Sequence, residues 1–250
     1  MAEAVGLAFA ILGAFNDAIQ CFEYVQVARN FDQSLQTAVL KLDIPKLRLS
    51  RWGQSVGLDR VETAVAGSRE DHQKAKELLD QIVDLFEDAE RVSGKLKPPA
   101  KDPAVYDTTR DLDEASASLH VKLQRLSLRR FKPRGVLNKA KWALYKEKSL
   151  NRLIQDITEL VTGLIELFPA ARSEQRRLCE QDGAELASDE HISLIAPLIE
   201  EQDPELSASI KSANPSAQPN FHITFAGSHN HGLQQGYFSG HQTNTFGARP

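Results

Sequence analysis

The C-terminal part of this 250-residue chain lacks charge: residues 220–246 contain no Asp, Glu, Lys or Arg. They also contain few aliphatic side chains, which excludes a packed core of their own. Gly, Asn, Gln, His, Ser and Thr dominate instead, with aromatic residues spaced among them. Two interpretations stay open. The segment is a disordered polar tail, or it stacks as cross-β between copies, because uncharged strands do not repel and Asn and Gln side chains form ladders.

Sequence motifs for catalysis and for cofactor binding are also missing. The chain has no GxxxxGK[ST] phosphate loop, no GxSxG elbow, no HExxH and no CxxC. Four histidines, His222, His229, His231 and His241, lie in the tail without Cys or acidic residues nearby, so their metal-binding signal is weak. We therefore expect no enzyme, no catalytic residues, no cofactor and no metal site.

Cysteine is scarce, since Cys21 and Cys179 are the only two and lie far apart in the sequence. This excludes a disulfide scaffold and fits a reducing compartment. The N-terminus lacks the basic residues of a signal peptide, because its only early charge is Glu3. We expect a cytoplasmic protein.

One apolar run stands out, from Ala4 to Phe15, in which no side chain is polar. A helix of that length is roughly 18 Å long, whereas a bilayer core is about 30 Å thick. Extending the helix to Phe22 adds Asp17, and an Asp near the centre of a span costs roughly 3 kcal/mol on insertion scales. Residues 1–22 are therefore either a conditional membrane-insertion segment or a buried N-terminal helix. The side chains that would enter lipid are Val5, Leu7, Phe9, Ile11, Leu12 and Phe15.

Alternation with a period of two is absent from the first 200 residues, and apolar residues recur at steps of three and four instead. This predicts an all-α helical bundle of roughly six to eight helices over residues 1–201, followed by a linker at 202–219 and the tail at 220–248. The clearest amphipathic helix is predicted at His72–Val92. Further helices are expected at 1–22, 22–49, 46–52, 111–131, 136–145, 149–168, 171–181 and 184–199, with a break or kink at Pro45.

Positive charge is concentrated in residues 122–152, where eleven Lys and Arg accompany a single acid, Glu147. Such a block could bind anionic lipid, at about 1 kcal/mol per cation near the surface. It could also bind nucleic acid, or pair internally with an acidic helix such as Glu77–Glu90. It lacks the interleaved aromatics and glycines of common RNA-binding signatures. The candidate lipid-binding cations are Arg129, Arg130, Lys132, Arg134, Lys139 and Lys141.

Several short segments resemble the HeLo domain of fungal HET-s/HET-S-type prion proteins. They are CFEYVQ (21–26), LKLDI (40–44), RLSRWG (48–53), and KWALY (141–145) with Lys148–Leu150, and the resemblance covers about residues 1–201. It implies a latent membrane toxin whose C-terminal amyloid motif is templated by a matching motif on a partner. The implied partners are other copies, an NLR-type receptor and membrane lipids, and no nucleic acid. Activation then moves the protein from the cytoplasm to the plasma membrane.

The tail is similar to the sigma-type amyloid motif of other fungal signalling proteins, because its repeats are short, Gly-rich and uncharged. A toxin and an inactive prion form both remain open, as do a non-toxic prion adaptor and a basic nucleic-acid-binding helical domain. The residues assigned to the amyloid motif are Asn220, Phe221, Phe225, Gly227, Asn230, Gly232, Gln234, Gly236, Phe238, Gly240, Gln242, Asn244 and Phe246.

Overall fold

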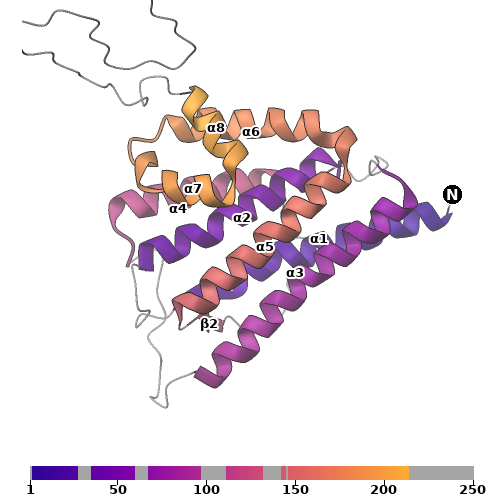
Figure 1. Cartoon of the computed structure of the whole chain (residues 1–250), viewed down its shortest axis with the longest axis horizontal. Helices are drawn as coiled ribbons and strands as arrows, with labels where there is room; N and C mark the ends of the chain where they lie inside the picture. Colours follow the sequence, from indigo (N-terminus) through magenta and orange to yellow (C-terminus); the bar gives the residue numbers. More distant parts are fainter. Residues whose placement is uncertain are drawn as a thin grey trace, which may run out of the picture.

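A computed structural model of the chain describes residues 2–27, 35–59, 67–96, 111–131, 142–144 and 146–213. Within these ranges the fold is the predicted bundle, with eight α-helices (Figure 1). The amyloid motif lies outside the described residues. The helices are α1 (Ala2–Tyr24), α2 (Leu35–Ser55), α3 (Arg69–Leu96), α4 (Glu114–Arg130), α5 (Glu147–Leu167), α6 (Arg172–Ala187), α7 (Ala196–Gln202) and α8 (Pro204–Ala213).

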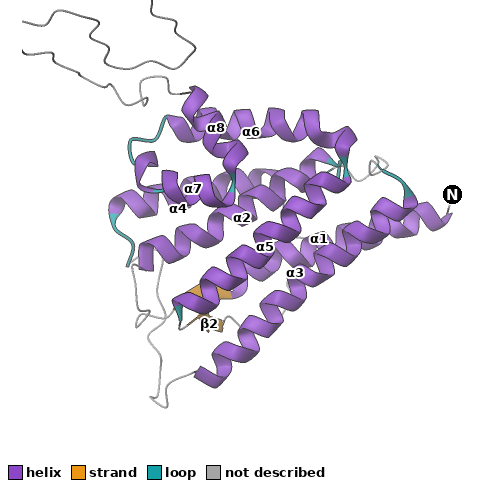
Figure 2. Ribbon diagram, in the orientation of Figure 1, coloured by secondary structure: helices purple, strands orange, loops and turns teal. Residues whose placement is uncertain are grey.

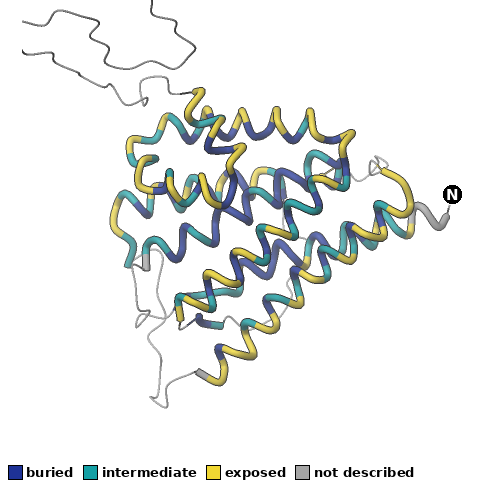
Figure 3. The backbone as a smooth tube through the Cα atoms, in the orientation of Figure 1, coloured by how far each residue is buried: buried dark blue, intermediate teal, exposed yellow. Residues whose placement is uncertain are grey.

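The two most amphipathic helices form as their sequence pattern predicts. In α3 the buried residues Ala75, Leu79, Ile82 and Phe86 follow steps of three and four, and α5 repeats this from Leu150 to Leu164. Helix α3 packs against both α1 and α5, so it lies alongside each of these two long helices (Figure 1). Burial follows the same faces along each helix, with exposed residues on the outside (Figure 3).

Helix α2 is buried on two sides and separates two apolar cores. Its residues Leu42 and Trp52 pack into the larger core, which α1, α3 and α5 also form. Its residues Ile44 and Leu47 pack into the smaller core with α4, α6, α7 and α8. Helix α2 therefore connects the two halves of the bundle. Because protein interiors are closely packed, a displacement in one core is transmitted through α2 to the other.

Pro45 and Gly53 both lie inside α2, so the helix continues past the position at which a break or kink was expected. Pro45 removes one backbone hydrogen bond from the helix, and Gly53 weakens it by roughly 1 kcal/mol. The buried faces of α2 compensate for both, because tertiary packing overrides local propensity.

A two-stranded parallel sheet was not predicted. Strand β1 (Val25–Val27) pairs with β2 (Trp142–Leu144), with Val25 opposite Trp142 and Val27 opposite Leu144 (Figure 2). The helix expected at 136–145 is therefore wrong over its last described residues. Strands of three residues are too short to produce a recognisable period-two pattern, which is why the sequence did not reveal them.

The linker expected at 202–219 is also corrected, since α8 occupies most of its first half. Pro204 is the first residue of α8, where its missing N–H costs no hydrogen bond. The Asp203 carboxylate accepts from the Leu206 N–H at 3.3 Å. Leu206 is buried in the smaller core, so α8 is an integral part of the domain.

Helix α8 crosses α6 in direct backbone contact at Gly183. A Cβ at this position would lie 2.6 Å from the Ser209 Cβ and 2.9 Å from the Ser209 carbonyl carbon. We predict that Gly183→Ala lowers the free energy of unfolding by about 1–3 kcal/mol through overpacking. Chemical denaturation measures this. In the control Gly94→Ala, the new Cβ meets no described atom within 4 Å, and an equal loss of stability there would contradict the prediction.

Candidate functional site

The predicted membrane-insertion residues lie on α1, which packs along α3. Ile11 and Phe15 are fully buried in the larger core, whereas Leu7 and Leu12 are half-buried. Phe9 points to solvent and is 58% exposed. Val5 belongs to α1, but its side chain is not among those described. The apolar segment thus contributes Ile11, Ala14 and Phe15 to the larger core, and Ala8 and Leu12 pack against it.

Aromatic rings fix the position of α1. Phe22 contacts Phe86 of α3 edge-on, with 4.9 Å between ring centroids. Phe15 contacts Phe131 at 5.5 Å in a T-shaped arrangement and Trp52 of α2 at 5.9 Å. Such pairs add about 0.5–1.5 kcal/mol each beyond their burial. Among the described residues, no helix combines the length and the hydropathy required to cross a bilayer.

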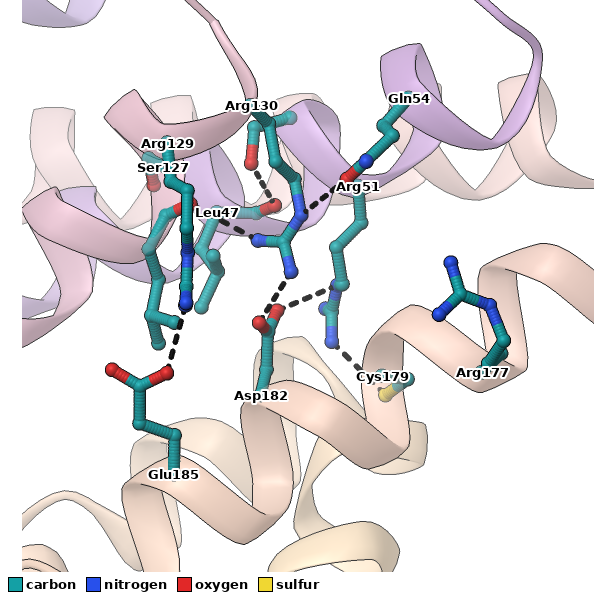
Figure 4. Close-up of polar contacts among 12 residues, drawn as sticks. Leu47, Arg51, Gln54, Ser127, Arg129, Arg130, Arg177, Cys179, Asp182 and Glu185 are labelled. Atoms are coloured by element: carbon teal, nitrogen blue, oxygen red, sulfur yellow. Dashed lines mark hydrogen bonds and ion pairs between the residues drawn. The ribbon is translucent and has the colours of Figure 1, made fainter.

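The described part of the basic block pairs with α6 and the loop after it. Arg129 Nη2 lies 2.8 Å from Glu185 Oε2, and Lys122 Nζ lies 3.3 Å from Asp189 Oδ2. Arg130 pairs with Asp182 (Figure 4). Internal pairing therefore occurs, but its acids come from α6 and the following loop rather than from the expected helix Glu77–Glu90.

These pairs limit which of the predicted lipid-binding cations face solvent. The Arg129 side chain is 56% exposed, whereas that of Arg130 is only 6% exposed. The hydrogen bond from Arg129 lowers the pKa of the Glu185 carboxyl, with Arg125 contributing as well. The other four cations, Lys132, Arg134, Lys139 and Lys141, lie outside the described residues.

A cavity of about 340 Å³ brings the two predicted sets of residues together. Leu12 and Phe15 line it from α1, and Arg129 and Arg130 line it from the end of α4. The insertion segment and the described lipid-binding candidates thus meet at one end of the bundle. Sequence reasoning identified both sets but not their proximity, because residues more than a hundred positions apart carry no signal of contact.

A buried ionic cluster, which sequence reasoning missed, ties the α7–α8 corner to α2. The Arg51 side chain is completely buried and pairs with Asp203. It also lies 3.8 Å from Asp182 and donates from Nη1 to the Cys179 sulfur at 2.9 Å (Figure 4). One turn earlier on α2, Arg48 lies 3.9 Å from Asp203, and burial, followed by repulsion from Arg51, lowers the pKa of its guanidinium to about 10.

Comparison with known proteins identifies the domain. The profile of the HeLo family, described as prion inhibition and propagation, matches residues 4–195. The chain belongs to the HeLo family. A second profile, the SesB domain on fungal death-pathway protein, matches residues 217–244 and overlaps the amyloid motif predicted at 220–248.

Two relatives of the HeLo chain come from Podospora anserina. Heterokaryon incompatibility protein S is 34% identical over 171 residues, covering 67% of this chain and 59% of the relative. Heterokaryon incompatibility protein s is 35% identical over 176 residues, covering 68% and 61%. The matched region thus spans less than two thirds of either relative.

Solved structures give the same fold. The HET-s N-terminal domain superposes with a TM-score of 0.74 and 28% identity, covering 82% of this chain and 97% of that domain. A double mutant of that domain gives 0.73 and 29%, covering 82% and 98%. The all-α prediction and the resemblance to the HeLo domain are both confirmed.

A second buried polar network joins α1, α2 and α4 of the HeLo domain. The buried Asp43 carboxylate lies 2.6 Å from the His120 imidazole and accepts from Gln124 at 2.8 Å. Lys46 completes the network by pairing with Glu23 in the last turn of α1. Burial lowers the pKa of His120, but the hydrogen bond and charge of Asp43 more than offset this and raise it above 6.5. Burial also raises the pKa of Asp43.

Both shifts predict that this network contributes less to stability as pH rises. A group whose folded pKa is raised stabilises the fold below its unfolded pKa and loses that contribution as pH passes its folded pKa. For His120 this loss starts near pH 6.5 and continues upward. We predict that Asp43→Asn abolishes this slope, since it removes the charge that holds the His120 proton. Urea denaturation at several pH values measures the effect, and an unchanged slope in the variant would refute it.

Proposed function

We propose that this chain is an amyloid-activated, membrane-disrupting effector of fungal programmed cell death and heterokaryon incompatibility. Assembly of the C-terminal motif releases α1, which then enters the membrane. One observation carries the proposal: an apolar helix that contributes to the larger core and a predicted amyloid motif belong to one chain, with only residues 214–216 between α8 and the region matched by the SesB profile. The names of the two relatives refer to heterokaryon incompatibility, and the description of the profile matched by the tail refers to a fungal death pathway, which together support the biological setting.

The connection between α8 and the tail motif is so short that the tail cannot easily assemble while the helical domain stays intact. Three extended residues span at most about 10 Å. Strands in a cross-β stack lie roughly 4.8 Å apart, whereas a helix of 28 residues such as α3 is about 42 Å long. Domains attached so closely to successive layers collide. Unpacking of α8 lengthens the connection and relieves the collision.

Loss of α8 would propagate through the buried ionic cluster. Asp203, at the start of α8, is the closest acidic partner of the fully buried Arg51 on α2. Removing one member of a buried ion pair costs about 3–5 kcal/mol, because the remaining charge is left without compensation. Helix α2 forms part of both cores, so this penalty loosens the surface on which α1 is docked.

Once released, α1 would bury Val5, Leu7, Phe9, Ile11, Leu12 and Phe15 in lipid. The cations Arg129, Arg130, Lys132, Arg134, Lys139 and Lys141 would seat the domain on anionic headgroups. Arg129 and Arg130 must first leave Glu185 and Asp182 on α6, so lipid binding follows disruption of the α4–α6 pairs. The trigger is an NLR-type receptor or another protein with a matching motif. The protein would then relocate from the cytoplasm to the plasma membrane.

Dye leakage from anionic vesicles tests the membrane step. Full-length protein is seeded with fibrils of a peptide covering residues 225–246. We predict that Leu12→Lys lowers leakage about a hundredfold, because a charge in the span costs roughly 3 kcal/mol, while fibril formation is unchanged. Val121→Lys is the matched control, since it adds the same charge at an exposed position on α4. Equal leakage from both variants would exclude α1 from the mechanism.

Lengthening the connection tests the coupling step. An insertion of about 20 Gly and Ser residues between Pro215 and Ser216 has a typical end-to-end distance of roughly 25 Å. It lets the motif assemble without pulling on α8. We predict normal fibrils but at least a tenfold loss of leakage, with the same insertion after Pro250 as the control. Undiminished leakage in the lengthened variant would show that crowding does not drive release.

A further inference from the structure

The ring of Phe15 on α1 rests directly against the backbone of α2 at Gly53. A Cβ at position 53 would lie 2.3 Å from the Phe15 Cζ and 2.6 Å from its Cε2. Those distances are far inside van der Waals contact, so the docked ring and any side chain at position 53 exclude each other. Gly53 lies inside a helix, where glycine is about 0.5–1 kcal/mol less favourable than alanine. Helix stability does not explain a glycine at position 53, whereas the close approach of the Phe15 ring does.

The walls around the ring are held by contacts that do not involve α1. Trp52 donates from its indole nitrogen to the Leu164 carbonyl of α5 at 3.0 Å and contacts Phe168 at 5.9 Å. Phe131, at the end of α4, closes the other side of the Phe15 ring. The side chains that surround the Phe15 ring are thus held in place by α2, α4 and α5, without help from α1.

One side of α1 before Phe15 packs loosely, although Ile11 and Ala14 on its other side are buried. Leu12 is half-buried beside the 340 Å³ cavity, and Phe9 is exposed. A Cβ at Gly13 would meet no described atom within 4 Å. Phe15 and Ile11 are the two buried members of the predicted insertion residues whose side chains the structure describes, and Phe15 is the one whose ring rests against the backbone of another helix.

We propose that Phe15 and Gly53 form a latch that sets how readily α1 leaves the domain. The contact is a shape fit between one ring and one helix backbone, so it can be weakened at position 53 without changing α1 or the tail. The consequence for membrane disruption rests on the proposed function. The docking itself does not, and it can be measured without lipid.

The two native cysteines report on release. Cys21 is buried on α1 and Cys179 is buried on α6. Single-cysteine full-length chains, made with Cys179→Ser or Cys21→Ser, are labelled with a thiol reagent under native conditions. We expect Gly53→Ala to accelerate labelling of Cys21 about tenfold and to leave Cys179 within twofold of its starting rate. Gly13→Ala, the matched control on α1, leaves both rates unchanged. An unchanged Cys21 rate in Gly53→Ala overturns the latch.

A compensating substitution separates the latch from general destabilisation. Leu at position 15 keeps α1 apolar but removes the ring atoms that meet position 53. Gly53→Ala should therefore accelerate Cys21 labelling much less in a Phe15→Leu background than in the wild type. If Gly53→Ala alone fails to fold, recovery of folding by Phe15→Leu supports the latch. Equal effects of Gly53→Ala in both backgrounds, or misfolding in both, overturn it.

Vesicle leakage then distinguishes the latch from the proposed function. If the latch and the proposed function are both correct, the Gly53→Ala variant reaches half-maximal leakage with about tenfold less fibril seed than the wild type. Faster Cys21 labelling without easier leakage supports the latch and contradicts the proposed function. Seed-dependent leakage with an unchanged Cys21 rate supports the function and overturns the latch.

Discussion

The burial of α2 between two cores is the constraint on which the rest of the structure depends. One face of this helix belongs to the core that it shares with α1, α3 and α5, and the other belongs to the core that it shares with α4, α6, α7 and α8. Its polar residues are buried as well, because Arg51 reaches the α6–α8 side and Lys46 reaches the end of α1. An event at the C-terminal helices and an event at the N-terminal helix are thus linked through one element, which is the property that a triggered effector requires.

The buried charges determine how the domain responds when α8 is displaced. Arg51, Asp182 and Asp203 lose their hydration in the domain and retain only each other and a few neighbours. Such a cluster contributes little net stability when complete, yet it is strongly destabilising when one member leaves. An apolar core of the same shape would loosen gradually. In the proposed mechanism the ionic cluster instead favours two states, with α8 either docked or displaced.

The sequence predicted the long helices that bury only one face. The stripes of α3 and α5 repeat over five turns or more, so their period is unambiguous. It did not predict α8, whose Ser- and Ala-rich surface resembles a linker until Leu206 is seen in the core, nor a sheet of three-residue strands. The burial of Arg51 was not predicted either, because a charged residue on a helix is expected to face solvent unless its partners are known. The candidate lipid-binding arginines were identified by composition, but their pairing with α6 depends on tertiary contacts that composition does not encode.

Hydrogen exchange of residues 2–24 in the full-length protein, measured with and without tail fibrils and in the absence of lipid, tests the account most directly. Amides of α1 are protected while its core face is docked, and they exchange when the helix leaves the bundle. The account predicts that polymerisation of the tail removes protection from α8 and α1 while α3 and α5 keep most of theirs. A polymerised tail with α1 protected as fully as in the free protein would contradict it.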